Sequence, residues 1–183
     1  MLAQVAIFLV DTVVAFFVFL LLARFHFHWL RVPFRNPLGE FVLATTSWCV
    51  VPARRVIPAL AGLDLATLLL AWALQALGLW IQAAIVGAEP GVAALAALAA
   101  VDLLRYSLYI LVFAIIVQVV FSWLNPYAPF APMFDMVTRP FLRPLRRFVP
   151  PIGSIDLTPL VLLVIVQVLL ILVGHLRAAA VGL

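Results

Sequence analysis

The chain has 183 residues, of which 68% are hydrophobic and 10% charged, and its mean hydropathy is +1.29. Soluble domains are about half apolar and about a quarter charged, so this composition excludes an ordinary soluble protein and indicates an integral membrane protein. The chain has eleven arginines and no lysine, and in a membrane protein these arginines serve topology and lipid headgroups rather than nucleic acid. The single cysteine, Cys49, excludes an intramolecular disulfide and a multi-thiolate metal site.

Four apolar runs are long enough to cross a hydrocarbon layer of about 30 Å as α-helices. They cover residues 4–23, 63–85, 107–124 (with a backward extension through Leu103 and Leu104) and 157–174. We expect the first run to remain in the protein as a span. It lacks the basic n-region of a signal peptide, and Arg24 follows it in place of a cleavage site.

A shorter alanine-rich run, Gly91–Val101, precedes the third span. It is too short to cross the membrane, so we expect an interfacial or re-entrant helix that leads into that span. Asp102, which ends the run, and Arg105 lie three residues apart and can pair on one helix face. The predicted fold is therefore an all-α membrane protein with about four spans, and five spans is the alternative.

Arginine is concentrated in two of the connections. Residues 24–62 carry five arginines and one glutamate, a net charge of +4, and residues 125–155 carry four arginines and one aspartate, a net charge of +3. Residues 86–106 between them carry two acidic residues and one arginine, a net charge of −1. The positive-inside rule places both basic connections in the cytoplasm and both termini outside. Two crossings separate the basic connections, which agrees with four spans, whereas five would put them on opposite sides.

The two basic connections and the spans that follow them repeat at an offset of 92 residues. The matching pairs are Thr46 with Thr138, Pro52 with Pro144, Arg54 with Arg146, Arg55 with Arg147, Pro58 with Pro150, Asp64 with Asp156, Leu65 with Leu157 and Gln75 with Gln167. The Asn-Pro turns, Asn36 with Pro37 and Asn125 with Pro126, match within three positions. Because both basic connections face one side, the repeats are parallel, which disfavours an inverted-repeat transporter. We predict a first two-span repeat at residues 1–87, an outer interfacial or re-entrant segment at 88–104, and a second two-span repeat at 105–183.

Each repeat carries a Pro-x-Arg-Arg motif that we predict to form a hairpin at the headgroup level, after a cytoplasmic-side amphipathic segment. In residues 138–159 several prolines remove amide donors and fix φ, so we do not expect a continuous helix there. The open carbonyls of such a stretch cannot lie exposed in hydrocarbon. The arginines expected to reach anionic headgroups or an acidic partner are Arg54, Arg55, Arg143, Arg146 and Arg147.

Asp64 and Asp156 stand at the start of the second span of each repeat. An aspartate there can accept backbone N–H bonds as an N-cap, and its charge suits the positive end of the helix dipole. It can also form a clasp with an arginine of the hairpin. One carboxylate has enough lone pairs for both roles.

Polar side chains also recur inside the spans. Gln75 and Gln167 each follow their aspartate by eleven residues, which places them on the same helix face, about 16 Å deeper. We expect them to bind neighbouring helices there, with a permeation site as the alternative. Asp11 lies in the outer half of the first span, where Gln82 or Arg105 could reach it; a proton relay is the alternative. The predicted intramembrane polar residues are Asp11, Gln75, Gln82, Gln118 and Gln167.

The sequence contains no catalytic constellation. His26 and His28 point to nearly opposite faces of a helix and cannot chelate one ion, His175 is alone, and Cys49 has no base nearby in sequence. A Gly-rich phosphate loop, a nucleophile elbow and an HExxH motif are all absent from the sequence. We therefore expect a protein that is not an enzyme and that binds no cofactor or metal.

The duplicated motif resembles that of the YggT family, also called YlmG in some bacteria and plastids. The resemblance rests on FSWLNP at residues 121–126, followed by TRPFLRPLRRFVPPIGSIDLTP at residues 138–159, and it extends over nearly the whole chain. The first half departs from the pattern at Ala53, where leucine or isoleucine is usual. The resemblance implies a multi-pass protein of the bacterial inner membrane with no enzymatic activity. Family members are connected with osmotic-stress tolerance, ion uptake, cell division and envelope organisation, and in plastids with nucleoid distribution and haem attachment to a b-type cytochrome.

The leading hypothesis is a membrane scaffold or assembly factor for envelope, division or stress-tolerance processes. Its expected partners are the bilayer, anionic lipid headgroups, a membrane protein or a second copy of the chain, and not nucleic acid. A small ion channel or transport component linked to osmotic stress is one alternative, motivated by the polar residues inside the spans. A haem or cytochrome assembly factor is the other.

Overall fold

The computed structural model describes residues 1–60, 62–125, 128, 130–149 and 156–181, and these residues form helices, turns and one isolated bridge between Leu60 and Leu63. The helices are α1 (Leu2–Trp29), α2 (Pro37–Val56), α3 (Leu65–Ile85), α4 (Val92–Leu124), α5 (Ala131–Leu145) and α6 (Thr158–Val181). Four of them, α1, α3, α4 and α6, are long and apolar enough to cross a membrane. The predicted all-α fold with four spans is confirmed, and the chain is a multi-pass membrane protein.

The four spans expose large apolar side chains because lipid, not water, surrounds them. Val13 of α1, Phe113 of α4 and Val164 of α6 are all exposed. An α-helix bonds its backbone N–H and C=O groups within the segment, as a hydrocarbon layer requires. The shorter α2 and α5 instead combine exposed arginines with buried residues such as Val50 and Leu142, which is the pattern of interfacial amphipathic helices.

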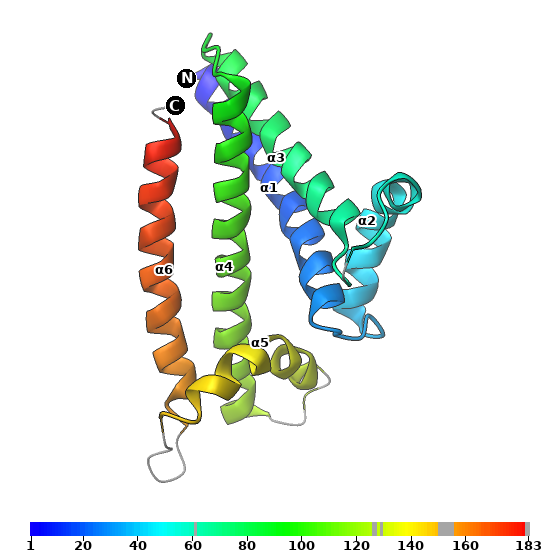
Figure 1. Cartoon of the computed structure of the whole chain (residues 1–183), viewed down its shortest axis with the longest axis vertical. Coiled ribbons are helices and arrows are strands. Elements are labelled where there is room, and N and C mark those ends of the chain that lie inside the picture. The colour runs from blue at the N-terminus through cyan, green and yellow to red at the C-terminus, as the bar shows by residue number, and fades with distance from the viewer. Residues whose placement is uncertain (61, 126–127, 129, 150–155, 182–183) are drawn as a thin grey trace.

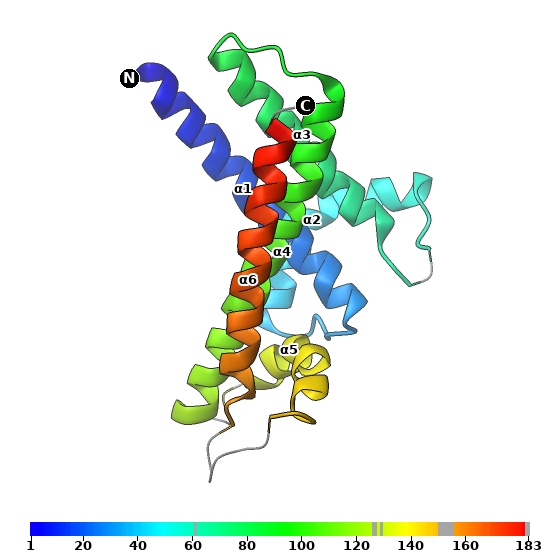
Figure 2. The same ribbon diagram turned by 60° about the vertical axis from the view of Figure 1, so that its left-hand side comes forward.

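The same order of helices, a span, an amphipathic helix and a second span, occurs in α1 to α3 and again in α4 to α6 (Figure 1). α1 packs along α3, α4 packs along α6, and contacts between α3 and α4 join the two groups. α2 and α5 lie toward the ends of the spans that are away from the chain termini, and both termini lie at the opposite end (Figures 1 and 2). α5 lies close to the end of the molecule away from the termini, whereas the C-terminal part of α2 projects sideways at about mid-height (Figure 1).

Close packing of α1, α3 and α4 forms one buried cluster of the structure, which includes Leu22, Ala71 and Leu103. α1 can approach α3 because Gly78 has no side chain. A Cβ added at Gly78 would lie 2.8 Å from Cγ1 of Val14, which is far inside van der Waals contact. Small residues allow membrane helices to pack closely where no hydrophobic force between helices exists.

The amphipathic helices are fastened to the spans by their buried faces. Val50 of α2 belongs to the cluster between α1, α3 and α4. Leu142 of α5 packs with Ile115 of α4 and Val166 of α6, and Phe134 of α5 shares a cluster with residues of α1 and α4. α5 is thus held against spans of both groups, which fixes where its arginines are presented.

The segment Gly91–Val101 does not form a separate interfacial or re-entrant helix as we expected. It continues without a break into the third span, and α4 is one helix of 33 residues. Its alanines favour helix strongly, and no proline or glycine interrupts the run from Val92 to Leu124. Asp102 lies within this helix, and its carboxylate is bound inside the protein. At 1.5 Å per residue α4 is about 50 Å long, so it exceeds the hydrocarbon layer and must tilt or project from it.

As predicted, residues 138–159 do not form one continuous helix, because α5 ends at Leu145 and a turn follows at Arg146–Phe148. The helices nevertheless extend further into the Pro-x-Arg-Arg motifs than their prolines suggest. α2 continues through Pro52, and α5 continues through Pro140 and Pro144. Each proline removes one N–H from the helix, but all three are exposed, and at the membrane surface water can satisfy the carbonyls that are freed. The rest of the second predicted hairpin, residues 150–155, lies outside the described residues.

Candidate functional site

The first arginine of each Arg-Arg pair is bound by the aspartate that begins the following span. In the first group, Arg54 donates from Nε to Oδ1 of Asp64 at 3.2 Å and from a terminal nitrogen to Oδ2 at 2.5 Å. This is the two-pronged geometry in which guanidinium and carboxylate groups bind most strongly. Asp64 also caps α3, since it accepts the backbone N–H of Thr67 at 3.4 Å and the Thr67 hydroxyl.

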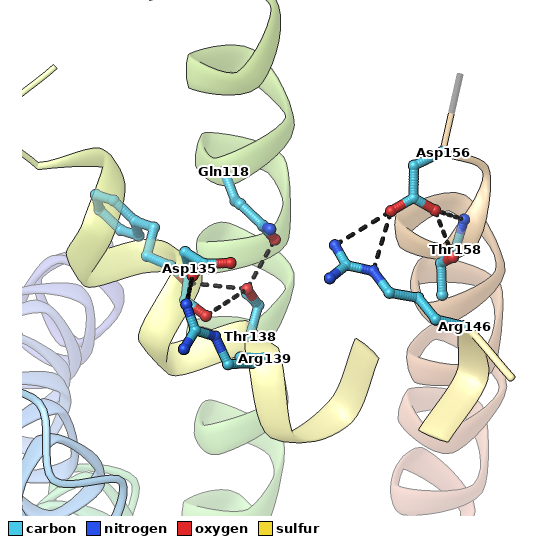
Figure 3. Close-up of polar contacts among 8 residues, drawn as sticks. Gln118, Asp135, Thr138, Arg139, Arg146, Asp156 and Thr158 are labelled. Atoms are coloured by element: carbon cyan, nitrogen blue, oxygen red, sulfur yellow. Dashed lines mark hydrogen bonds and ion pairs between the residues drawn. The ribbon is translucent and has the colours of Figure 1, made fainter. Parts of the chain in front are cut away.

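In the second group Arg146, Asp156 and Thr158 correspond to these three residues, but two nitrogens of the arginine bind one carboxylate oxygen (Figure 3). Arg146 donates to Oδ2 of Asp156 from Nε at 3.1 Å, and its terminal nitrogen lies 3.1 Å from the same oxygen. The backbone N–H of Thr158 donates to Oδ1 at 2.9 Å, and so does the Thr158 hydroxyl. The Asp156 side chain is 40% exposed, whereas that of Asp64 is 3% exposed. The two aspartates combine capping with arginine binding, but only the first does so away from solvent.

The pKa values of both carboxyls reflect these contacts. Burial alone would raise the pKa of Asp64, but the hydrogen bonds from Arg54 and Thr67 outweigh burial and hold the pKa below its ordinary value. Burial also acts to raise the pKa of Asp156, and the bonds from Thr158 and Arg146 again lower it. Both groups are therefore ionised at neutral pH and hold their arginines as true ion pairs.

The other three predicted docking arginines are left available. Arg55, Arg143 and Arg147 are exposed, and within the described ranges none of them has an ion-pair partner or a side-chain hydrogen bond. The residue after each Arg-Arg pair, Val56 or Phe148, is also exposed. We call Arg55, Val56, Arg143, Arg147 and Phe148 the basic surface. The two arginines of each pair thus have different roles, because the first binds an aspartate of the same chain and the second is exposed.

A buried threonine attaches each amphipathic helix to the preceding span. Thr46 of α2 accepts a hydrogen bond from Arg24 of α1 at 2.8 Å, and Ser47 accepts a second from Arg24 at 3.2 Å. Thr138 of α5 donates to Oε1 of Gln118 of α4 at 2.7 Å (Figure 3). Arg24 is buried, and sequence reasoning treated it only as a topology charge. Its signal was its position at the inner end of the first span, 22 residues before Thr46.

The spans also contain a buried charge cluster that links three of them. Asp102 of α4, only 1% exposed, accepts a hydrogen bond from Nε of Arg177 of α6 at 2.7 Å and one from Nε2 of Gln75 of α3 at 3.0 Å. Arg105 adds a longer ion pair with Asp102, at 3.7 Å. The predicted contact of Gln75 with another helix and the predicted pair of Asp102 with Arg105 are both present, whereas the sequence pattern does not indicate Arg177. No local spacing could reveal a contact between residues 75 positions apart.

Of the remaining predicted intramembrane residues, Asp11 and Gln82 bind each other, whereas Gln167 has no partner among the described residues. Asp11 of α1 accepts a hydrogen bond from Gln82 of α3 at 3.3 Å, on the exposed side of both helices. Gln167 of α6 is exposed, and its side chain makes no hydrogen bond to any described residue of the chain. Although Gln167 corresponds in sequence to Gln75, the structure gives only Gln75 a partner.

The two Asn-Pro turns play different roles. Asn36 is the N-cap of α2, where its Oδ1 accepts the N–H of Gly39 at 2.8 Å and its Nδ2 donates to the carbonyl of Pro33 at 2.8 Å. Pro37 occupies the first helical turn, where a missing N–H costs little. Asn125 instead follows the last residue of α4, and Pro126 lies outside the described residues.

The chemistry that this arrangement supports is ion pairing and anion binding. Among residues that the structure describes, no three His, Cys, Asp or Glu side chains gather as metal ligands. His26 and His175 each place Nδ1 against a carbonyl of their own helix, at 2.6 and 2.8 Å. A cavity of about 660 Å³ adjoins the Arg146–Asp156 pair, between α4 and α6. Polar Gln118 and Arg146 line it together with apolar side chains, a mixture that suits an amphipathic lipid.

Comparison with known proteins gives a consistent result over most of the chain. The sequence model of the CCB3/YggT family matches residues 3–85 and 97–177. An uncharacterized protein of Pseudomonas aeruginosa is 30% identical over 181 residues, which cover 97% of this chain and 92% of the relative. YggT of Escherichia coli K12 is 30% identical over 164 residues, 88% of this chain and 85% of the relative. No solved structure matches the chain significantly. Each matched segment contains one Arg-Arg pair and its aspartate.

Proposed function

We propose that this chain, which belongs to the CCB3/YggT family, is a non-enzymatic membrane scaffold that docks an acidic membrane-associated partner on its basic surface. In this proposal the spans and the Asp–Arg pairs hold the surface in shape, and anionic headgroups surround it. The scaffold serves an envelope, division or stress-tolerance process. Identification of the partner would tell which of these it is.

The observation that carries the proposal is the division of roles within each Arg-Arg pair. An arginine needed only to set topology has no reason to lie beside a second arginine that is fixed by an aspartate. Arg55 and Arg147 are instead presented beside fixed neighbours, each next to an exposed apolar residue. A cation next to an apolar side chain on a rigid support is the composition of a protein-binding hot spot. The first copy lies at the C-terminal end of α2, and the second directly follows α5.

The positive-inside rule supports a cytoplasmic location for both copies, since each belongs to a connection rich in arginine. Arg31 and Arg35, in the connection between α1 and α2, are also exposed and have no ion pair among the described residues. They belong to the first basic connection but not to the basic surface as defined above. These two arginines therefore provide a control with the same loss of charge.

Co-purification from native membranes tests the proposal. Arg55→Gln combined with Arg147→Gln is expected to leave the yield of inserted protein unchanged and to reduce a co-purifying protein at least severalfold. Arg31→Gln combined with Arg35→Gln removes the same charge and is expected to retain that protein. If the first pair retains every co-purifying protein, the docking proposal is wrong. If both pairs lose the protein equally, overall charge and not the basic surface is responsible.

Ion transport is the second candidate, and the exposed Asp11–Gln82 pair is the observation that favours it. A carboxylate inside an apolar span is costly and is often part of an ion pathway. Asp102 supports this candidate less, because Arg177 and Gln75 already satisfy its charge inside the protein. Flux of K⁺, Na⁺ or H⁺ into proteoliposomes that contain folded protein, abolished by Asp11→Asn, would favour transport over the scaffold.

A further inference from the structure

We infer that the chain forms a parallel homodimer in which α6 of one copy packs against α6 of a second copy, with Gln167 at the centre of the interface. The inference concerns the outer face of α6, which takes no part in the basic surface. The dimer can therefore be tested independently of the docking proposal.

The first observation is the unsatisfied amide of Gln167. Gln167 lies eleven residues after Asp156, about 16 Å along the helix and so within the hydrocarbon layer. Its side chain is exposed and makes no hydrogen bond to the described part of the chain. An amide left without a partner in hydrocarbon costs several kcal/mol, according to transfer measurements of about 4–8 kcal/mol into a solvent that cannot hydrogen-bond. The corresponding Gln75 avoids this cost by donating to Asp102 at 3.0 Å.

The second observation is the spacing of the residues that share a face with Gln167. Val164, Gln167, Ile171, Gly174 and Ala178 follow one another at intervals of three and four residues, and all five are exposed. These intervals are those of the a and d positions in a parallel two-helix coiled coil. The buried residues of α6, including Leu162, Val166 and Val173, lie on a different face, toward the rest of the chain. We call the five exposed residues the α6 seam.

The third observation is the open space at Gly174. A Cβ added there would meet nothing within 4 Å, whereas at Gly78 it would meet Val14 at 2.8 Å. Gly78 is used by the contact between α1 and α3, but no described residue of this chain uses Gly174. Gly174 and Ala178 form a small-xxx-small pair, the pattern that lets two membrane helices approach closely. On the α6 seam, Gln167 can therefore form a hydrogen bond to another helix, and Gly174 and Ala178 allow that helix to approach closely.

A second copy suits this seam because glutamine is complementary to itself. The Gln167 amide contains both a donor and an acceptor, so two copies related by a two-fold axis can each give and receive one hydrogen bond. A two-fold interface brings the same patch of both subunits together. Copies inserted in the same orientation also present their α6 helices in parallel and at equal depth, as the seam requires.

Disulfide crosslinking in a Cys49→Ala background tests the dimer in native membranes. Ile171→Cys lies on the seam and Leu172→Cys lies beside it, and the native side chains are similarly exposed, at 60% and 55%. Ile171→Cys is expected to give an adduct of twice the chain mass that contains two differently tagged copies, and Leu172→Cys is expected to give little. Gln167→Leu in the Ile171→Cys protein is expected to lower the crosslinked fraction about fivefold, which corresponds to a loss of about 1 kcal/mol.

Three results would overturn the inference. The first is equal crosslinking from Ile171→Cys and Leu172→Cys, which would show that random collisions form the adduct. The second is an adduct of another mass, which would show that a different protein covers the seam. The third is an unchanged crosslinked fraction in Gln167→Leu. Because Gln167 has no partner among the described residues, its replacement is not expected to unfold the monomer, and a thermal unfolding curve checks this.

Discussion

Replacement of Arg177 by leucine is expected to destabilise the protein, because it leaves the Asp102 carboxylate buried without its closest counter-charge. Asp102 is 1% exposed, and Nε of Arg177 lies 2.7 Å from its Oδ1. Removal of one partner from a fully buried ion pair costs about 3–5 kcal/mol. The Arg177 side chain is 33% exposed and Gln75 still donates to Asp102, so we expect the lower value of about 2–3 kcal/mol.

The double variant distinguishes a charge effect from a packing effect. Asp102→Leu combined with Arg177→Leu removes both charges, and replacement of a buried ion pair by apolar side chains is often neutral. We therefore expect the double variant to lie within about 1 kcal/mol of the native protein, which gives a coupling energy of at least about 2 kcal/mol. Arg105→Leu is the control, since its ion pair with Asp102 is longer, at 3.7 Å, and its loss should cost less than that of Arg177.

The assay is reversible unfolding in mixed micelles, with the free energy measured for both single variants and the double variant. If the two single losses add in the double variant, Asp102 and Arg177 are not coupled. The cluster would then not join α4 to α6 through its charges. If Arg105→Leu costs as much as Arg177→Leu, the loss reflects side-chain volume and not the geometry of the pair.

Three further predictions follow from the other contacts. Asp64→Asn should cost about 2 kcal/mol and Asp156→Asn less than about 1 kcal/mol in the same unfolding assay, because only Asp64 is buried; equal costs would contradict this. The lowered pKa of Asp64 stabilises the folded state at pH values above the ordinary aspartate pKa, and this stability is lost as the pH falls through the folded value; a pH series should show acid destabilisation that Asp64→Asn reduces. Gly78→Ala should cost about 1–3 kcal/mol through the clash with Val14, whereas Gly174→Ala, which meets nothing, should change thermal stability little.

Much of the fold could be predicted from the sequence because lipid imposes simple rules. The composition, the four apolar runs and the distribution of arginine were enough to indicate an all-α membrane protein with four spans, and the structure confirms both. The sequence was less informative about where helices begin and end, because the surroundings of a residue can override its usual effect on a helix. Pro140 and Pro144 normally break a helix, but at an exposed surface α5 tolerates them. The run Gly91–Val101 is too short to cross alone, but its alanines and the absence of proline or glycine from Val92 to Leu124 let it continue into the third span as one helix.

The sequence could predict those contacts of the candidate site that join residues close in sequence or that occur in both repeats. The matched offset of the Arg-Arg pairs and their aspartates pointed to a clasp, and Arg54 and Asp64 lie only ten residues apart. The contact between Arg177 and Asp102 depends on how α6 packs along α4, and the contact between Arg24 and Thr46 on how α2 packs against α1. The pattern of a single sequence contains no information on how helices pack. Helix packing also gives Gln75 and Gln167 their different environments.

The docking of a partner on the basic surface is tested most directly by photo-crosslinking in native membranes. A photoreactive residue at Phe148, next to Arg147, is compared with one at Phe8, an exposed residue near the opposite end of the spans. We predict that Phe148 gives a discrete protein adduct that Phe8 does not give, and that Arg55→Gln with Arg147→Gln abolishes it. An adduct that forms equally from both positions, or that persists without the two arginines, would contradict the proposed function.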